Sequence, residues 1–425
     1  MEKVLRAIEK IIPRYVYRFF QPVYHYFLAI LSTVMYRIPS RQIYTIGITG
    51  TKGKSSTTEF VNAVLESSGK KTAILSTIRF KVGDSSRTNK YKMTMPGRFF
   101  TQKFLRDAVD AGCDYAIIEM TSEGARFYRH IGIELDALIF TNLSPEHIES
   151  HGSFEKYKAA KLRLVKHLAK STKPNRISIA NRDNIHGFSF LIHTVEKNRG
   201  YSLKDIQIIS ETEKASVIVY KGETITIPLP GRFNISNALA ALTLSEELSI
   251  PLTKARLGIE SLTEIRGRVE RIDVGQNFTV IVDYAHTDDS LKKLYETFKG
   301  SHKIAVLGST GGGRDAWKRK VLGTIADELC DEIIITNEDP YDEDPMKIIT
   351  DVAQGVTQHT PVIILDRRLA IAHALSLARE NSVILISGKG TDPYIMGPHG
   401  TKEVWDDATV AREELGKMLT KNNHI

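Results

Sequence analysis

The segment Gly47-Ile48-Thr49-Gly50-Thr51-Lys52-Gly53-Lys54-Ser55 constrains the fold of this chain more than any other segment. A β-branched run precedes it and a stretch with helical periodicity follows it, so the pattern predicts a strand, a loop and a helix. Glycines let backbone N–H groups close around phosphate oxygens, and the helix N-terminus adds positive potential. A lysine here bridges phosphates, and a serine hydroxyl reaches Mg²⁺. The segment predicts a nucleoside-triphosphate site made of Gly50, Thr51, Lys52, Gly53, Lys54, Ser55 and Ser56.

Short β-branched runs alternate with helical stretches from residue 43 onward, which indicates parallel sheets with crossover helices. In the first series we expect strands at 43–48, 73–76, 115–120 and 137–141, and helices at 55–68, 99–111 and 154–167. In the second series we expect strands at 279–283, 303–307, 332–336, 362–365 and 382–386. The fold class is therefore α/β. We predict an N-terminal helical segment, 1–40, a central domain with a mostly parallel sheet of phosphate-loop type, 41–266, and a Rossmann-like domain, 267–425.

The first 40 residues are rich in aromatic and basic side chains. Their longest apolar run, 23–35, includes His25, Ser32 and Thr33 and is shorter than the about 18 apolar residues that a spanning helix needs. The segment also has no small-residue cleavage pattern of a secretory signal. Two interpretations remain open: a helix lying on anionic lipid, which the mixture of aromatic and basic residues favours, and an apolar helix packed on protein.

Cysteine content and charge limit the compartment and the partners. Two cysteines, Cys113 and Cys330, among 425 residues argue against a disulfide framework and favour the reducing cytoplasm. The formal charge of +8 suits nucleic acid, anionic lipid or phosphorylated ligands. Because the sequence has no recognition helix or base-stacking motif, we expect small-molecule substrates and no nucleic acid. A cytoplasmic protein with peripheral membrane contact is the resulting expectation.

The loop departs from the strict phosphate-loop spacing, because Ile48 stands five positions before Gly53. Gly-Thr-Lys-Gly-Lys-Ser resembles the shortened loop of the Mur ligase and folylpolyglutamate synthetase superfamily. Further motifs of that superfamily follow in order, at residues 118–122, 140–147, 157–161, 231–237, 267–270 and 282–287. The resemblance runs from about residue 43 into the C-terminal region. It implies an ATP-dependent ligase that joins a carboxylate to an amine through an acyl-phosphate.

The resemblance also implies ATP, two Mg²⁺ ions and a lysine carbamate as cofactors. A carboxylate at the end of a parallel strand, such as Glu119, suits Mg²⁺. Imidazole is an unusual Mg²⁺ ligand, so His147 is assigned from the resemblance alone. Lys161 matches the lysine that family members carbamylate. The implied metal ligands are Ser55, Glu119, His147 and carbamylated Lys161; the catalytic residues are Lys54, His147, Lys161 and Arg314; and further nucleotide contacts are Asn234, Asn237, Arg268 and Asp283.

Within the superfamily, the chain is similar to the branch that adds the third amino acid of the peptidoglycan stem. Thr94, Thr121 and Arg129 match the contacts of that branch to the muramoyl-peptide acceptor. Asp339 and Asp392 fall, with Arg314, where the branch binds the incoming amino acid. Members that add diaminopimelate carry an arginine where this chain has Tyr341 and a His-Glu pair where it has Thr391-Asp392. We therefore expect a diamino acid with a free distal amine, such as lysine.

Only 46 residues precede Gly47, so we expect the uridine-binding domain of this branch to be absent. The acceptor would then be held without a uridine contact, be supplied by a partner, or be lipid-linked. Nucleotide residues on both sides of 266–268 also predict hinge closure.

Two other functions are compatible with parts of the sequence. Addition of glutamate to a folate or a poly-amino acid is opposed by Thr94, Thr121 and Arg129. A catalytically silent nucleotide-binding scaffold at the membrane is opposed by Lys54, Glu119, His147 and Lys161.

Overall fold

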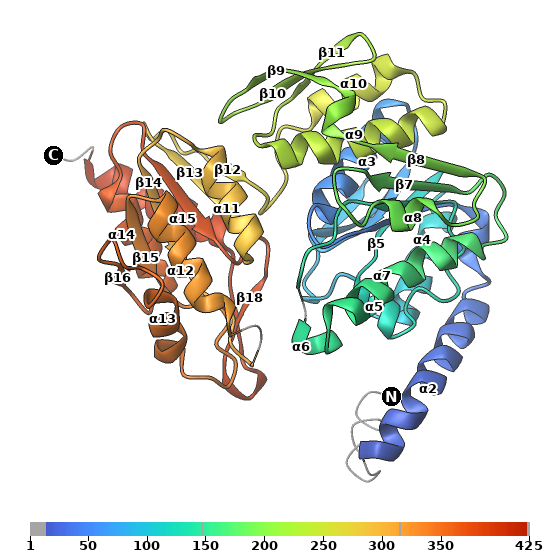
Figure 1. The fold of residues 1–425 in the computed structure, drawn as a ribbon, viewed down its shortest axis with the longest axis horizontal. Coiled ribbons are helices and arrows are strands. Elements are labelled where there is room, and N and C mark those ends of the chain that lie inside the picture. The colour runs from blue at the N-terminus through green and yellow to red at the C-terminus, as the bar shows by residue number, and fades with distance from the viewer. Residues whose placement is uncertain (1–13, 147, 314–315, 423–425) are drawn as a thin grey trace. The chain divides into compact units, whose positions relative to one another are not determined.

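The computed structural model describes residues 14–146, 148–313 and 316–422, and Figure 1 shows its helices and strands. The contacts divide the chain into two compact units. Of the described residues, the first unit comprises 14–146, 153–202 and 239–255, and the second comprises 148–152, 203–238, 256–313 and 316–422. The expected domain limits at 40/41 and 266/267 remain predictions.

An eight-stranded sheet forms the centre of the first unit, with its strands in the order β4-β3-β2-β5-β1-β6-β7-β8. The strands are β1 Tyr44–Thr49, β2 Thr72–Leu75, β3 Arg79–Val82, β4 Ser85–Thr88, β5 Tyr115–Glu119, β6 Ala137–Phe140, β7 Ile177–Asn181 and β8 Lys197–Tyr201. All pairs from β2–β5 to β7–β8 are parallel, whereas β2–β3 and β3–β4 are antiparallel. Since β1 lies between β5 and β6, the loops that follow these three strands leave the same edge of the sheet.

The helices around this sheet are α2 Arg14–Met35, η1 Pro39–Gln42, α3 Lys54–Ser67, α4 Arg98–Asp110, α5 Ser122–Arg126, α7 Phe154–Ala169 and α8 Phe188–Leu191. Helices α3, α4, α7 and α8 pack on the strands, whereas α2 packs on α4 and α5 packs on α7. Phe104 of α4 and Leu164 of α7 pack in one buried cluster with Leu75, Ile118 and Phe140 of the sheet. A parallel sheet with helices on its faces needs nearly continuous apolar strands, and β1, β2, β6 and β7 have that character.

Helix α2 packs on the first unit through its more polar face. Ser32 and Thr33 are buried, and Thr33 lies against Gly132. The ring of His25 meets the ring of Phe127 edge to face, with centroids 5.6 Å apart. The opposite face is a stripe of seven exposed apolar side chains: Val23, Tyr26, Phe27, Ile30, Leu31, Val34 and Met35. Of the helices that the structure describes, none combines the length and apolar character needed to cross a bilayer.

A six-stranded sheet organises the second unit, in the order β12-β13-β17-β14-β15-β16. The strands are β12 Glu270–Ile272, β13 Thr279–Asp283, β14 Lys303–Leu307, β15 Glu332–Ile335, β16 Val362–Ile363 and β17 Val383–Ser387. The helices are α11 Asp288–Thr297, α12 Lys318–Leu329, α13 Pro345–Ala353, α14 Arg367–Leu377 and α15 Asp407–Asn422. Only β12–β13 is antiparallel among the described pairs of this sheet.

Alternate residues of these strands point to opposite faces, so each face has its own core. Ile281, Ala305 and Leu385 pack with residues of α11, α12 and α13 in one buried cluster. Val280 and Ile384, which alternate with them, pack with residues of α14 and α15 in another cluster. This two-sided covering makes the sheet a doubly wound layer, as the sequence pattern predicts.

The remaining elements are short or antiparallel. A separate sheet has the order β11-β10-β9, with β9 Gln207–Glu211, β10 Ser216–Tyr220 and β11 Glu223–Ile227, and a two-stranded sheet pairs β18 Tyr394–Met396 with β19 Lys402–Val404. The other helices are α6 Ile148–His151, η2 Leu203–Asp205, α9 Arg232–Glu247, α10 Leu252–Ser261 and η3 Pro398–Gly400.

The predicted α/β class is confirmed, and the expected strands of both series are present with ends that differ by at most two residues. The sequence did not predict β3, β4, β7, β8, the β9–β11 sheet, β12, β18 or β19. Strands β4 and β9 carry mostly exposed residues in place of an apolar run, and β3, β12, β18 and β19 have only three or four residues each.

Candidate active site

The glycine-rich loop connects β1 to α3, where the sequence predicts it. Gly50 needs to be glycine, because a Cβ there would lie 1.9 Å from the hydroxyl oxygen of Thr141. Gly53 precedes the first residue of α3 with φ +80°, a left-handed conformation that favours glycine. Ser55 and Ser56 are buried in the first turn of α3. The loop therefore has the close backbone approach and the helix N-terminus that a phosphate site requires.

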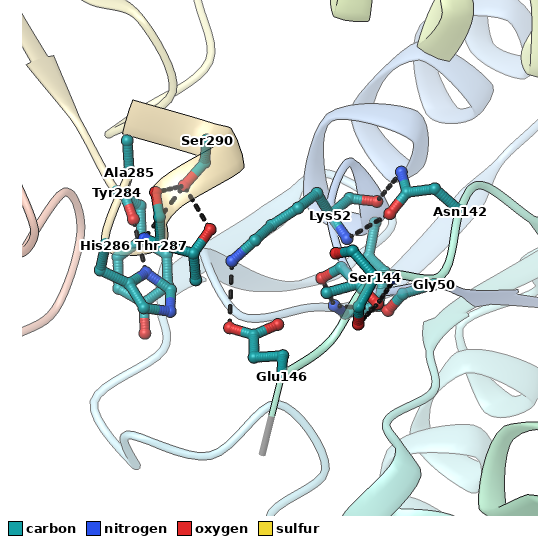
Figure 2. Close-up of polar contacts among 12 residues, drawn as sticks. Gly50, Lys52, Asn142, Ser144, Glu146, Tyr284, Ala285, His286, Thr287 and Ser290 are labelled. Atoms are coloured by element: carbon teal, nitrogen blue, oxygen red, sulfur yellow. Dashed lines mark hydrogen bonds and ion pairs between the residues drawn. The ribbon is translucent and has the colours of Figure 1, made fainter. Parts of the chain in front are cut away.

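The segment after β6 holds this loop in place (Figure 2). The backbone N–H of Lys52 donates to Oδ1 of Asn142 at 2.9 Å, and its Nζ lies 3.0 Å from Oε1 of Glu146. Thr51 shares a hydrogen bond of 2.9 Å with the hydroxyl of Tyr157. Asn142, Glu146 and Tyr157 lie within the family motifs at 140–147 and 157–161, and those motif positions were the only sequence signal for their roles.

Two lysine amines meet at one carbonyl oxygen of the loop. Nζ of Lys54 donates to the Gly50 oxygen at 3.0 Å and to the Thr51 oxygen at 2.9 Å. Nζ of Lys161, from α7, donates to the same Gly50 oxygen at 2.7 Å. Lys161 is only 2% exposed, and burial, followed by repulsion from Lys54, holds the pKa of its amine well below the usual lysine value. The neutral amine is consequently favoured there.

A buried carboxylate lies at the end of β5. Glu119 is fully buried, and its two oxygens accept hydrogen bonds from the backbone N–H and the hydroxyl of Thr77, at 3.2 and 2.9 Å. The Thr77 hydroxyl also bonds to that of Thr94 at 2.8 Å. Thr77 thus joins the proposed metal ligand to a proposed acceptor contact. Nothing in the local sequence singled it out, because its partners are 17 and 42 positions away.

The oxygen ligands fit a Mg²⁺ ion that is shared with a nucleotide. Mg²⁺ is usually held by one or two carboxylates together with substrate phosphates and water. Glu119 and the buried hydroxyl of Ser55 match that pattern. Among the residues that the structure describes, no group of three His, Cys, Asp or Glu side chains is placed to hold a metal by itself. His147 lies outside the described residues.

The proposed acceptor contacts occupy the turn before α4 and the segment around α5. The Thr121 hydroxyl accepts from the Gly124 N–H at 3.0 Å and caps α5. Arg129 donates to the carbonyl oxygen of Met95, the residue after Thr94. Burial lowers the pKa of the Arg129 guanidinium below its usual value. Thr94 and Arg129 are therefore joined through the 94–95 backbone. The Thr121 hydroxyl, in contrast, caps the N-terminus of α5.

The nucleotide contacts proposed for the second unit form two pairs. Asn234 donates to the Pro230 oxygen at 2.8 Å, and Asn237 donates to Asn234 at 3.4 Å. The Arg268 guanidinium lies over the ring of Tyr284, 4.5 Å from its centroid. Asp283 accepts two backbone N–H bonds of 2.7 Å, and burial raises the pKa of its carboxyl group.

The two acidic residues assigned to the incoming amino acid share a buried lysine. Nζ of Lys389 lies 2.9 Å from Asp339 and 3.3 Å from Asp392. Lys389 is 1% exposed, and Asp339 also accepts from the Met396 N–H at 2.8 Å. Lys389 offsets acidic charge at these two residues, and no role was predicted for it from the sequence. Arg314 lies outside the described residues.

The fold and this site define a nucleotide-using α/β enzyme. Residues 48–245 match the Mur ligase middle domain, and residues 267–390 match the Mur ligase glutamate ligase domain. A UDP-N-acetylmuramyl-tripeptide synthetase of Roseiflexus is 36% identical over 92% of this chain and 82% of its own length. A UDP-N-acetylmuramoyl-L-alanyl-D-glutamate–2,6-diaminopimelate ligase of Bacillus licheniformis is 34% identical over 91% of this chain and 82% of its own.

Solved structures agree on the fold. The structure of a UDP-N-acetylmuramoyl-L-alanyl-D-glutamate–2,6-diaminopimelate ligase is 26% identical, with a TM-score of 0.60 over 89% of this chain and 79% of that one. The Mycobacterium tuberculosis folylpolyglutamate synthase complexed with ADP is 16% identical, with a TM-score of 0.67 over 87% of this chain and 93% of that one. This likeness shows a shared fold alone.

The chain belongs to the Mur ligase family. It is an ATP-dependent, ADP-forming ligase that makes amide bonds and uses ATP with Mg²⁺. The resemblance to the branch that adds the third stem amino acid is confirmed by the relatives that match.

Proposed function

We propose that this ligase adds an amino acid to the carboxylate of a muramoyl dipeptide in peptidoglycan precursor synthesis. The observation that carries the proposal is the hydrogen-bonded series from Glu119 through Thr77 to Thr94, which joins a proposed metal ligand to a proposed acceptor contact. The names of the similar relatives support the substrate class. The reaction belongs in the cytoplasm, where the two buried free cysteines are stable as thiols.

The mechanism begins with phosphate transfer from ATP to the acceptor carboxylate. The loop N–H groups and Lys54 bind the phosphates, so Lys54 exchanges its two backbone carbonyl contacts for phosphate oxygens. Ser55, Glu119, His147 and carbamylated Lys161 would hold two Mg²⁺ ions, which supply charge neutralisation during the transfer. The amine of the incoming amino acid then attacks the acyl-phosphate carbonyl, and phosphate leaves. Asn234, Asn237, Arg268 and Asp283 are proposed to contact the nucleoside.

Lys161 is proposed to act as a carbamate. A neutral amine nitrogen attacks the carbon of CO₂ and loses a proton, so a neutral side chain becomes an anionic one. The buried position of Lys161 and its lowered pKa favour the neutral amine that this reaction needs. The resulting carboxylate oxygens are suitable Mg²⁺ ligands.

Phosphate release from ATP tests the function and the identity of the amine. With a nucleotide-linked muramoyl dipeptide, we expect release with lysine or ornithine to exceed release with diaminopimelate at least about tenfold. A second carboxylate left without a charged partner costs about 1.5–3 kcal/mol. The variant Tyr341→Arg should raise the rate with diaminopimelate. Faster release with diaminopimelate in the unmodified protein would overturn the amine assignment, and release only with a pteroate acceptor would overturn the substrate class.

We further propose that α2 rests on an anionic lipid surface. Its exposed face is the stripe of seven apolar side chains, while the polar Ser32 and Thr33 are buried against the protein. Residues 14–35 include Arg14 and Arg18 and no acidic residue. An exposed apolar face on a helix whose sequence holds basic and no acidic residues suits an anionic bilayer interface.

Vesicle sedimentation tests the membrane contact. We expect the full chain to sediment with vesicles that contain phosphatidylglycerol and to remain in solution with pure phosphatidylcholine. The double variant Phe27→Ser/Val34→Ser should lower binding by about tenfold or more, because each substitution removes apolar area from the interface. Val404→Ser, which alters an exposed valine outside α2, is the control. Equal sedimentation of the control and the double variant would contradict lipid docking through this stripe.

A further inference from the structure

Basic side chains gather around Phe127 in the first unit. Arg98, the first residue of α4, donates through Nη2 to the Phe127 carbonyl oxygen. The His25 ring contacts the Phe127 ring at 5.6 Å between centroids, and the Arg126 guanidinium lies 5.5 Å from the centroid of that ring. Arg129, two positions further along, donates to Met95. Three separate segments thus bring positive or proton-bearing groups to one place, which we call the Phe127 cluster: His25, Arg98, Arg126 and Arg129.

Two polar nitrogens of this cluster are buried without a hydrogen-bond partner among the atoms that the structure describes. They are Nε of Arg98 and Nδ1 of His25. A buried polar atom that makes no hydrogen bond costs roughly 1–3 kcal/mol, so such atoms usually indicate a missing water or ligand. Arg98 belongs to α4 and His25 to α2, so these two unpartnered nitrogens come together only through tertiary packing.

Electrostatic repulsion from neighbouring cations also acts on Arg98 and His25, whereas Arg129 has the acidic neighbour Glu123. Burial, followed by repulsion from Arg129, lowers the pKa of Arg98 to about 10. Burial, followed by Arg98 and Arg129, lowers the pKa of His25 to about 4. The N-terminus of α4 adds positive potential, since Gly97 has no side chain to cap it and the first turn has no acidic residue. An anion bound there would relieve this repulsion.

The cluster is continuous with the proposed acceptor site. Arg129 holds the carbonyl of Met95, and the preceding residue, Thr94, bonds to Thr77 beside Glu119. An anion at the cluster would therefore belong to the same molecule as the carboxylate to be activated. A phosphate group suits the cluster better than a carboxylate, because its tetrahedral oxygens can accept donors from three directions.

We propose that Arg98 and His25, together with Arg129, bind a phosphate group of the muramoyl acceptor. The inference rests on the proposed function and adds to it two residues that lie outside the superfamily motifs. It also gives α2 a role in substrate recognition, because His25 belongs to that helix. The phosphate can come from a nucleotide-linked or from a polyprenyl-diphosphate-linked acceptor.

Binding of the acceptor to the full chain, measured by titration calorimetry without ATP, tests the proposal. Arg98→Gln should raise the Kd for nucleotide-linked muramoyl dipeptide by about 10-fold or more, since hydrogen bonds to charged groups are the strong ones. His25→Phe keeps the ring contact with Phe127 and should raise the Kd about 5-fold, as the loss of one neutral hydrogen bond predicts. Arg87→Gln, which removes the same charge from the exposed strand β4, should leave the Kd unchanged.

Three acceptors separate the outcomes. A larger effect of Arg98→Gln on one of the two phosphate-bearing acceptors identifies the source of the phosphate. An equal effect on the bare muramoyl dipeptide would show that the cluster binds a carboxylate, and it would overturn the proposal. Unchanged affinity in Arg98→Gln would overturn it while leaving the proposed function intact, whereas failure of the unmodified protein to bind any of the three would overturn both. If Arg98→Gln does not fold, Arg98→Lys, which keeps the charge but loses the planar fork, should still weaken binding.

Discussion

Substitution of Lys161 by glutamine is expected to lower amine-dependent phosphate release by at least about 100-fold, because glutamine cannot form the carbamate that is proposed to hold a metal ion. Lys161 donates to the Gly50 oxygen at 2.7 Å, and glutamine keeps a side-chain N–H that can still donate to this oxygen. The loss should therefore appear in the rate of phosphate release. Nucleotide binding, which depends on the loop and Lys54, should change much less.

Lys166→Gln is the matched control, because Lys166 lies on the same helix and is exposed. It should retain the unmodified rate. A second measurement does not depend on activity: magnetic resonance of the protein in isotopically labelled bicarbonate should show one carbamate signal that Lys161→Gln abolishes. Full activity of Lys161→Gln, or a labelled signal that persists in this variant, would contradict the carbamate.

The pH dependence of the carbamate signal follows from the lowered pKa of the Lys161 amine. Only the neutral amine reacts with CO₂, and a lower pKa gives more neutral amine at a given pH. Carbamylation of Lys161 should thus be present near neutral pH, where an exposed lysine is almost wholly protonated. It should be lost as the pH falls through the pKa of the buried amine.

Substitution of Arg367 by leucine is expected to lower the free energy of unfolding of the second unit by about 3–5 kcal/mol. The side chains of Arg367 and Asp407 are fully buried, and their guanidinium and carboxylate groups lie 2.7 Å apart. The same guanidinium donates to the carbonyl oxygens of Asn337 and Ser387. Leucine removes all these donors and leaves the Asp407 charge buried, which is costly without a cationic partner.

Arg368→Leu is the control, because Arg368 is the next residue of α14 and its ion pairs, with the exposed Glu413 and the partly buried Glu414, are open to solvent on the arginine side. Loss of the Arg368 ion pairs should lower the free energy of unfolding by at most about 1 kcal/mol. Both tryptophans, Trp317 and Trp405, belong to the second unit, so their fluorescence during urea unfolding reports on this unit. Similar unfolding midpoints for the Arg367 and Arg368 variants would mean that the buried pair contributes no more than a surface pair.

Much of the fold follows from local sequence. The strand Lys303–Leu307 and the strand Thr279–Asp283 have the bounds that their apolar runs predict. The turn between β1 and α3 was also predictable, because glycines and helix-starting residues act on their immediate neighbours. The β9–β11 sheet was not predictable in this way. Its strands have five residues each, and β9 and β11 carry exposed residues that interrupt the apolar pattern.

In the candidate site, too, some residues were predictable from local sequence and some contacts were not. The loop residues, Glu119 and Lys161 were predicted from motifs of consecutive residues, and their assigned roles remain proposals. The sequence did not indicate that Thr77 would bond to Glu119, or that Lys389 would lie between Asp339 and Asp392. These contacts join residues on different elements, so they exist only once the strands and helices have packed.

The amino-acid sequence by itself determined the α/β class, the phosphate loop and the family, because all three depend on periodicity and on short runs of residues. Tertiary structure alone decided that Lys161 and Lys54 share the Gly50 carbonyl, and that His25 and Arg98 meet at Phe127. Burial and charge repulsion at these places depend on residues up to 111 positions apart. A pKa shift or an unpartnered buried donor arises from that packing and has no signature in the local sequence.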